Sequence, residues 1–233
     1  MMQGKLITFE GIDGVGKSTH VKFIHKLLLD SGSDVELVRE PGGNEISEAI
    51  RSIVLNSDFT NMKDETELLL YLASRAQTVA DNIQPLLNSG YIVLCDRFID
   101  STLAYQGYGR GLNIDFIKTA CDFSTGGLMP DKTILFTISE AAREDRLSRR
   151  SGFDRIELAD IEFKLRVAAG FEKIAASEKG RISVIDTSHK HSTTAKKVLS
   201  ALRPVLDIDF DDCFLDEELC KLDSEHDHSK QNI

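Results

Sequence analysis

The residues from Gly11 to Ser18, Gly-Ile-Asp-Gly-Val-Gly-Lys-Ser, have the types and spacing of a loop that binds phosphate. Glycines at both ends let the backbone wrap around an anion, with its N–H groups pointing inward and the positive end of the following helix dipole behind them. Lys17 can reach the outer phosphates of a nucleotide, and the Ser18 hydroxyl can ligate Mg²⁺. The alternative is a chance glycine-rich turn. We favour the phosphate loop because the apolar run Leu6–Phe9 precedes it and a helix-compatible segment follows it, as the motif requires.

A second group of polar residues follows another apolar run, Tyr91–Cys95. Asp96 stands at the end of this predicted strand, the position at which enzymes with a phosphate loop hold magnesium. The fixed fork of N–H donors on Arg97 suits phosphoryl oxygens and the charge that develops on them during transfer. Alone, the two residues could equally be a strand-end acid paired with a neighbouring arginine. Together with the phosphate loop, they indicate a catalytic site.

Short apolar runs rich in β-branched residues alternate with long helix-compatible stretches, which predicts a parallel sheet. The predicted strands are Leu6–Phe9, Val35–Val38, Tyr91–Cys95, Thr133–Ile138 and Ile182–Ile185. The predicted helices span residues 17–31, 44–57, 64–88, 113–124, 140–150, 157–178 and 191–203. Right-handed crossovers place such helices on both faces of the sheet and ligands at the carboxyl ends of its strands. We therefore expect one doubly wound, five-stranded α/β domain of the P-loop NTPase type over residues 1–206.

Charge is distributed unevenly along the 233-residue chain, whose net charge is −10. Residues 207–233 hold ten acidic residues against two lysines, a net charge of −8, which leaves −2 for the rest. A partner nucleic acid is not expected, because it would need a local basic cluster that the sequence lacks. A membrane partner is not expected either, since no apolar run could span a bilayer and no basic and apolar leader precedes Lys5. We expect a cytoplasmic protein.

The acidic segment 207–233 predicts a short docked amphipathic helix followed by a partly disordered end. Its apolar residues are helically spaced but surrounded by acids: Phe210, Phe214, Leu215, Leu219 and Leu222. The four cysteines of the chain include no CxxC pair, which favours reduced thiols. A zinc site built from Cys213, Cys220, His226 and His228 is disfavoured because the spacing matches no common site.

Four segments, in order along the chain, resemble the thymidylate kinase family, whose members phosphorylate dTMP to dTDP with ATP. They are Lys5–Ser18, Arg39–Gly43, Leu69–Gln77 and Asp96–Gly107. A phosphate loop alone defines only a superfamily, but Arg-Glu-Pro-Gly-Gly and Asp-Arg…Ala-Tyr-Gln are specific to this family, and residues 107–111 extend the pattern of its bacterial form. The resemblance runs from about Lys5 to Ile185. It implies ATP and dTMP as substrates, Mg²⁺ as cofactor and a homodimer.

The resemblance also implies which residues form the site. ATP binding falls to Gly11, Ile12, Asp13, Gly14, Val15, Gly16, Lys17, Ser18 and Thr19. Binding of dTMP falls to Asp13, Glu40, Arg51, Tyr71, Arg75, Arg97, Ser101, Thr102, Tyr105 and Gln106. The metal ligands are Ser18 and Asp96, and the catalytic residues are Lys17, Asp96, Arg97, Arg150 and Arg155.

The side chains of the implied dTMP site suit thymine. Arginine has only donors, so Arg75 would favour the O4 acceptor of thymine over the amine of cytosine, while Gln106 can accept from N3–H. Tyr71 stands where the family usually has a stacking phenylalanine and keeps the ring face, and Tyr105 is placed to crowd the 2′ side of the sugar. Without the resemblance, Tyr71 could be a core aromatic and Arg51 a solvated helix charge.

Arginines crowd the segment around Ser151-Gly152 at positions 143, 146, 149, 150 and 155. On a helix this could be a solvated basic face, but the segment resembles the family's lid, about residues 140–157, which expels water and supplies positive charge. Some thymidylate kinases carry the catalytic basic residue in the phosphate loop, where this chain has Gly14 and Val15. We therefore expect the charge from Arg150 and Arg155, with Arg155 favoured because Asp154–Glu157 matches the family.

Two other functions are compatible with a phosphate loop. A kinase for another nucleoside monophosphate would share the fold and the loop, and a substrate panel separates it. A GTPase-like switch would be expected to carry Asn-Lys-x-Asp, which does not occur in the chain. The chain departs from the family pattern at Asn44, Ser74 and Thr78, none of which removes a group that the chemistry requires.

Overall fold

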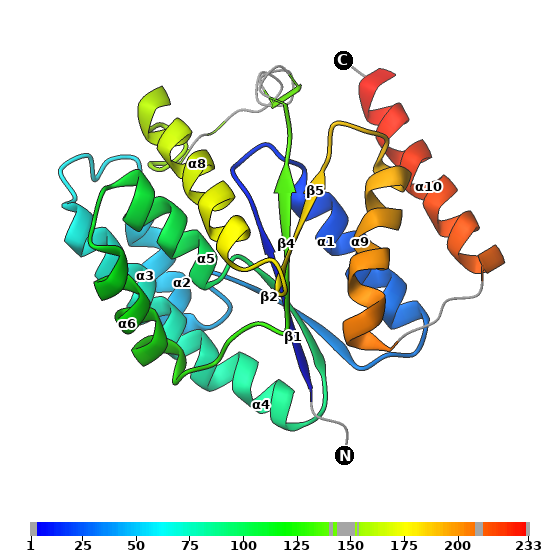
Figure 1. Cartoon of the computed structure of the whole chain (residues 1–233), viewed down its shortest axis with the longest axis horizontal. Coiled ribbons are helices and arrows are strands. Elements are labelled where there is room, and N and C mark those ends of the chain that lie inside the picture. Colours follow the sequence, from blue (N-terminus) through cyan, green and yellow to red (C-terminus); the bar gives the residue numbers. More distant parts are fainter. Residues whose placement is uncertain (1–3, 140–141, 144–151, 153, 208–211, 232–233) are drawn as a thin grey trace.

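The sheet lies at the centre of the molecule with helices on both sides (Figure 1). The structure, a computed structural model of the chain, describes residues 4–139, 142–143, 152, 154–207 and 212–231, with the side chains of 215–224 in the last range. Across the sheet the strands are β2 (Val35–Arg39), β3 (Ile92–Asp96), β1 (Lys5–Glu10), β4 (Lys132–Thr137) and β5 (Ile182–Asp186), all parallel. This confirms the predicted five-stranded parallel sheet.

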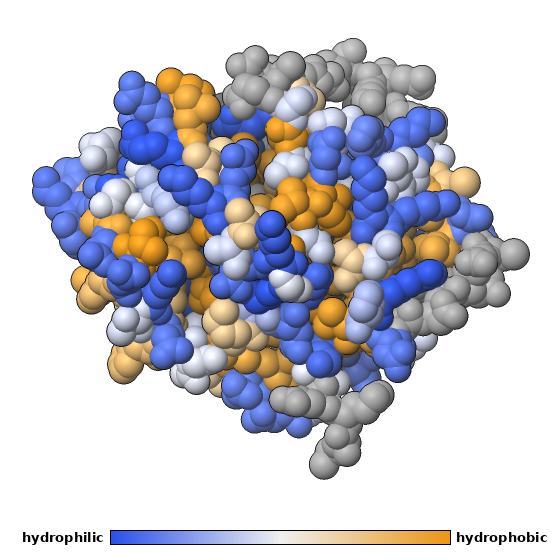
Figure 2. All heavy atoms as spheres, in the orientation of Figure 1, coloured by the Kyte–Doolittle hydropathy of each residue, from blue (hydrophilic) through white to orange (hydrophobic). Residues whose placement is uncertain are grey.

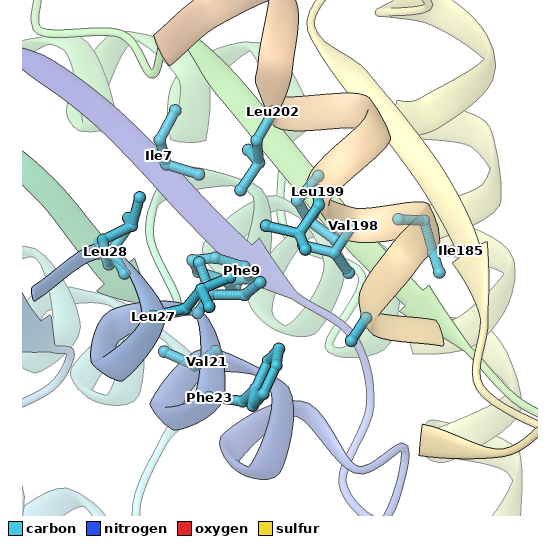
Figure 3. Close-up of a cluster of buried hydrophobic side chains, with 14 of the residues drawn as sticks. Ile7, Phe9, Val21, Phe23, Leu27, Leu28, Ile185, Val198, Leu199 and Leu202 are labelled. Atoms are coloured by element: carbon cyan, nitrogen blue, oxygen red, sulfur yellow. The ribbon is translucent and has the colours of Figure 1, made fainter. Parts of the chain in front are cut away.

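Helices from the two ends of the chain cover one face of the sheet: α1 (Lys17–Asp30), α9 (His191–Leu206) and α10 (Asp212–Gln231). The core on this face contains Phe9 of β1, Leu27 of α1 and Leu199 of α9, all buried (Figure 3). Burial of such side chains is the main favourable term for folding. This face of the fold therefore fixes the phosphate loop, which joins β1 to α1.

The other face is covered by the middle of the chain. Its helices are α2 (Glu45–Val54), α3 (Asp64–Thr78), α4 (Gln84–Asn88), α5 (Ile99–Thr102), α6 (Ile114–Thr125) and α8 (Ile161–Ser177). Two π-helical segments, η1 (Val79–Ile83) and η2 (Leu103–Gly109), continue α3 and α5. On the surface shown in Figure 2, hydrophilic and hydrophobic side chains are interspersed. No helix in the described part of the chain is long and apolar enough to cross a membrane.

The predicted continuous helix over 64–88 is instead α3, η1 and α4. Pro85 explains the difference, because it has no N–H and its ring clashes with the carbonyl four residues earlier. The π-helical turn of η1 accommodates this loss just before α4 begins at Gln84. α5 and η2 were not predicted, because a single turn and a five-residue hydrogen-bond spacing leave no clear 3.6-residue period.

Other boundaries differ where a local cap ends or begins the helix. α8 begins at Ile161 rather than 157 because Asp160 caps it, its Oδ1 accepting from Phe163 N at 2.6 Å. α2 begins after Asn44, which caps it in the same way, and ends at Val54 rather than 57. The acidic C-terminal helix is longer than the short helix predicted, since α10 extends to Gln231. The predicted helix over 140–150 and much of the expected lid lie outside the described residues.

Candidate active site

A cleft of about 510 Å³ opens at the carboxyl ends of β1, β2 and β3. Residues 12–19 of the phosphate loop line one side of it, and residues following β2 and β3 line the other. Each residue predicted to bind dTMP lines this cleft: Asp13, Glu40, Arg51, Tyr71, Arg75, Arg97, Ser101, Thr102, Tyr105 and Gln106. The fold therefore brings the residues predicted to bind ATP and those predicted to bind dTMP together in one cavity.

The phosphate loop follows β1 without an intervening residue and ends where α1 begins at Lys17. Gly11 has a φ of +139°, and a Cβ atom there would lie 2.5 Å from the carbonyl oxygen of Phe136. Only glycine therefore fits this close approach of the loop to β4. The N-terminus of α1 points its N–H groups at the cleft, which suits a bound phosphate.

Lys17 and Asp96 form an ion pair across the base of the cleft, with Nζ 3.1 Å from Oδ1. Ser18 lines the same cleft. Mg²⁺ prefers oxygen ligands and in phosphoryl-transfer enzymes is held by one or two protein groups plus the phosphates, so the Ser18 hydroxyl and the Asp96 carboxylate fit it. Among the described residues there is no group of three or more His, Cys, Asp or Glu side chains that could hold a metal ion.

Arg97 connects the phosphate loop to the end of β3. Its Nη1 donates to the carbonyl oxygen of Gly11 at 3.0 Å and to Ser101 Oγ at 3.1 Å, and its Nη2 donates to Asp13 Oδ1 at 2.6 Å. Tyr105 also donates to Asp13, from its hydroxyl to Oδ2 at 3.2 Å. Burial alone would raise the pKa of Asp13, but the charges of Arg97 and Lys17 outweigh it and hold that pKa below its usual range. Asp13 is therefore an ionised acceptor in the cleft.

Arg97 has a left-handed backbone, with φ of +73°, and Glu10 stabilises the turn that follows it. Glu10 is buried at the end of β1, where its Oε1 accepts from the backbone N–H of Phe98 at 2.8 Å and of Ser101 at 3.2 Å. Its Oε2 accepts from Ser101 Oγ at 2.5 Å. Burial and the nearby charge of Asp100 raise the pKa of Glu10 to about 7. The carboxyl group thus holds the chain segment that carries Arg97 and Ser101.

Arg75 is buried and forms an ion pair with Glu40, with Nε 2.7 Å from Oε2. Its Nη1 donates to Thr102 Oγ1 at 2.8 Å and to Cys121 Sγ at 3.7 Å, and its Nη2 donates to the carbonyl oxygen of Phe98 at 3.0 Å. Within the described residues these contacts leave one of the five N–H donors of arginine for a ligand in the cleft. Arg75 is thus held in place by protein contacts at the edge of the cleft, and its role in base binding stays a prediction.

Gln106 is oriented by Glu67, to which its Nε2 donates at 2.8 Å. Because a carboxylate only accepts hydrogen bonds, the amide nitrogen of Gln106 must face Glu67. Its amide oxygen then remains as the acceptor that the N3–H of a pyrimidine requires. Gln106 lies in η2, and π-helical turns are frequent at functional sites.

Arg51 and Tyr71 border the acceptor side of the cleft. Arg51 is half-buried, and its Nη1 donates to the carbonyl oxygen of Pro41 at 2.9 Å, so it is not a solvated helix charge. Burial, followed by the charge of Arg39, lowers the pKa of Arg51. Tyr71 is partly exposed to the cleft rather than enclosed in the core, and burial and the charge of Glu67 raise its pKa, so its hydroxyl stays neutral.

Comparisons with known proteins agree on one family. Residues 9–198 match the model of the thymidylate kinase family. The chain belongs to this family. It is 42% identical over 206 residues to a thymidylate kinase of Exiguobacterium sibiricum, covering 87% of this chain and 97% of the relative, and 40% identical over 207 residues to one of Bacillus pumilus, covering 88% and 98%. A crystal structure of thymidylate kinase from Ehrlichia chaffeensis has a TM-score of 0.72 and 31% identity, covering 85% of this chain and 98% of that chain.

In this member of the thymidylate kinase family, Arg155 lies beside the cleft and is not among the residues that line it. Its Nη2 donates to Glu67 Oε2 at 2.6 Å and its Nε to the carbonyl oxygen of Val54 at 3.0 Å. Arg150, the other lid arginine predicted to be catalytic, lies outside the described residues. Arg143 contacts the phosphate loop, with Nε 3.3 Å from the carbonyl oxygen of Asp13.

Sequence reasoning missed two residues that organise the site, Glu10 and Glu67. Glu10 could have been found, because an acid at the end of a fully buried strand and directly before the loop must have partners. Glu67 gives no such signal, because an acid in the first turn of α3 is what a helix ordinarily carries there.

Proposed function

We propose that this member of the thymidylate kinase family transfers the γ-phosphoryl group of ATP to dTMP, giving dTDP and ADP. The observation that carries the proposal is the shared cleft, in which the phosphate loop faces Arg75 and Gln106. A donor phosphate on the loop and a nucleotide base on these two residues would put the reacting phosphates between them. Such a transfer needs positioning and charge neutralisation rather than a covalent enzyme intermediate.

The residues of the cleft divide this work. The N–H groups of the phosphate loop and Lys17 hold the donor phosphates, and Arg97 presents donors to the phosphoryl group from a side chain fixed by Asp13 and Ser101. Ser18 and Asp96 would hold Mg²⁺, which when bound neutralises phosphate charge. Arg51 lies where it can bind the phosphate of the acceptor. The ionised Asp13 can accept from a sugar hydroxyl.

Base selection follows from the hydrogen bonds described above. Glu67 fixes the Gln106 oxygen toward the cleft as an acceptor for N3–H, and the remaining donor of Arg75 favours O4 over an amine. Cytosine offers an acceptor at N3 and an amine at position 4, so it would leave both protein groups mismatched. Uracil differs from thymine only by a methyl group, which is worth about 1–3 kcal/mol in a pocket.

A coupled ADP-release assay with dTMP, dUMP, dCMP, dGMP and GMP side by side tests the function. We expect the highest kcat/KM for dTMP, with dUMP lower by about 10- to 200-fold but measurable. Turnover of another nucleotide above that of dTMP would support the alternative, a kinase for a different nucleoside monophosphate. Complete absence of turnover at saturating dUMP would contradict the proposed pocket.

The proposal includes a homodimer formed through α2, α3 and α6. Large apolar side chains are exposed on these neighbouring helices: Ile46, Ile53, Leu69, Phe116 and Phe123. Phe123 is 88% exposed, and a second copy of this chain would cover it in the dimer. Sedimentation should show a dimer for the wild type and a monomer for Phe123→Asp. Leu29→Asp is the control, because Leu29 is exposed on α1, on the opposite face of the sheet, and this variant should remain a dimer.

We also propose a cytoplasmic location. The described cysteines, Cys95, Cys121 and Cys220, are free thiols, and reduced thiols fit a reducing compartment.

A further inference from the structure

The acidic helix α10 is an integral part of the fold, although the family model ends at residue 198. Its Leu215, Leu219 and Leu222 are buried in the same core as α1 and α9. Figure 1 shows α10 alongside α9 on the outer side of the molecule. Glu218 of α10 forms an ion pair with Lys26 of α1, with Oε2 2.6 Å from Nζ.

The N-terminus of α9 lacks the capping groups that helices usually carry in their own sequence. Lys190 occupies the N-cap position and makes no side-chain capping bond, and the first turn of α9 contains no acidic residue. Asp223 of α10 supplies both the capping acceptor and the negative charge. Its Oδ1 accepts from the backbone N–H of Ser192 at 2.9 Å, and its Oδ2 accepts from Ser192 Oγ at 2.7 Å. The carboxylate thus satisfies an N–H group of the first turn and places a negative charge at the positive end of the helix.

The turn that leads into α9 supports the phosphate loop. Thr187, buried just after β5, donates from its hydroxyl to the carbonyl oxygen of Val15 in the loop at 2.7 Å. Its backbone N–H donates to the carbonyl oxygen of Thr137, at the end of β4, at 2.9 Å. Because Val15 is bound through its carbonyl, the position of this turn affects how the N–H groups of the loop face a phosphate.

This turn lies at the edge of the sheet where we expect the phosphoryl donor, ATP, to bind. Apart from Asp13 in the loop, the acceptor residues follow β2 and β3, whereas the turn follows β5, beyond β1 and β4 in the strand order. If the acceptor occupies the ends of β2 and β3, the nucleoside of the donor must extend over the ends of β4 and β5. This step rests on the proposed function.

We propose that Asp223 is a positioning residue for ATP: by capping α9 from α10, it fixes the turn at Thr187 against the phosphate loop. The effect should therefore fall on the donor nucleotide and leave the acceptor site, on the other side of β1, unchanged.

The test compares Asp223→Ala with two matched variants. Asp223→Asn keeps an acceptor for the Ser192 N–H and removes the charge. Asp216→Ala removes the same charge from α10, since Asp216 pairs with Lys196 of α9 at 3.0 Å without reaching its N-terminus. We expect Asp223→Ala to raise the KM for ATP and the Kd for ATP measured by calorimetry by about fivefold, the factor that results when the stability cost of a lost helix cap appears in full as weaker ATP binding. The KM for dTMP should change less than twofold. Asp216→Ala should stay near wild type, and Asp223→Asn should lie between wild type and Asp223→Ala, because it keeps the acceptor but loses the charge.

Equal changes in the KM values of ATP and dTMP, or an unchanged Kd for ATP in folded Asp223→Ala, would overturn the proposal. If Asp223→Ala does not fold, Asp223→Leu, which is close to aspartate in shape but cannot accept from the Ser192 N–H, carries the same test, and an unchanged Kd for ATP would overturn the proposal there. Failure of the proposed function looks different, because the wild type would then not phosphorylate dTMP at all.

Discussion

The ion pair of Arg75 and Glu40 gives the sharpest prediction for stability. Both side chains are almost fully buried, at 2% and 4% exposure, and Arg75 also holds Thr102 and the carbonyl oxygen of Phe98. Burial raises the pKa of Glu40 even with Arg75 beside it. Arg75→Met keeps much of the side-chain volume but leaves a buried carboxylate without its partner.

The expected cost follows from this burial. Removing one partner of a buried ion pair destabilises a protein by about 3–5 kcal/mol, because the remaining charge is uncompensated. For a chain of this size that corresponds to a fall in Tm of about 6–20 °C. Replacing both residues, as in Arg75→Met with Glu40→Gln, removes the uncompensated charge. The loss of stability in this double variant should be smaller than the sum of the two single losses by at least about 2 kcal/mol.

The free energy of unfolding of the wild type, the two single variants and the double variant is measured by urea unfolding followed by circular dichroism. The four m values must be equal for these free energies to be compared. Arg39→Met is the control, because Arg39 pairs with Glu48 at the surface, where both side chains are nearly half exposed, and such a pair is worth about 0–1 kcal/mol. Strict additivity in the cycle, or a cost of Arg75→Met no larger than that of the control, would refute the reasoning.

Three further outcomes are expected. Arg155→Ala should lower kcat by about 10²-fold or more with little change in the KM for dTMP, since a lid arginine stabilises charge in the transition state; an unchanged kcat in steady-state assays would move the role to another arginine. Burial and Asp100 raise the pKa of Glu10 from its usual 4.5 to about 7, so folding favours its protonated form, and its contribution to stability is present below pH 4.5 and lost as pH rises to 7. In urea titrations across that range, the wild type should lose stability relative to Glu10→Gln, and parallel pH profiles would contradict this. Leu219→Ala should cost about 2–5 kcal/mol by denaturation if α10 is docked as described, and a cost as small as that of Leu29→Ala at the surface would show that it is not.

Sequence patterns predicted the sheet and the phosphate loop because both signals are local. A buried parallel strand is a continuous apolar run, and the glycines and Lys17 are adjacent in the chain. The pairing of Asp96 with Lys17 follows from strand order, since β3 lies directly beside β1. The sheet and the place of the phosphate loop were therefore predicted correctly, whereas the helix predicted over 64–88 was wrong although Pro85 is itself a local signal.

The contacts that orient the site residues could not be read in this way. Glu67 and Gln106 are 39 positions apart, and Asp223 lies 31 positions beyond Ser192. Each pair depends on how whole helices pack, and an acidic residue on a helix has the same local pattern whether it is solvated or buried against an amide. For α10, the sequence predicted the buried apolar residues from their helical spacing but not the length of the helix, which extends to Gln231.

Glu67 accepts hydrogen bonds from Gln106 and Arg110, at the end of η2, and from Arg155, in a separate segment of the chain. One negative charge is thus shared among three donors, and any motion that removes Arg155 leaves that charge to the other two. Gln106 and Arg155 therefore share one acceptor, Glu67, although they lie far apart in the sequence. A single carboxylate on α3 in this way joins two residues predicted to form the site, Gln106 and Arg155.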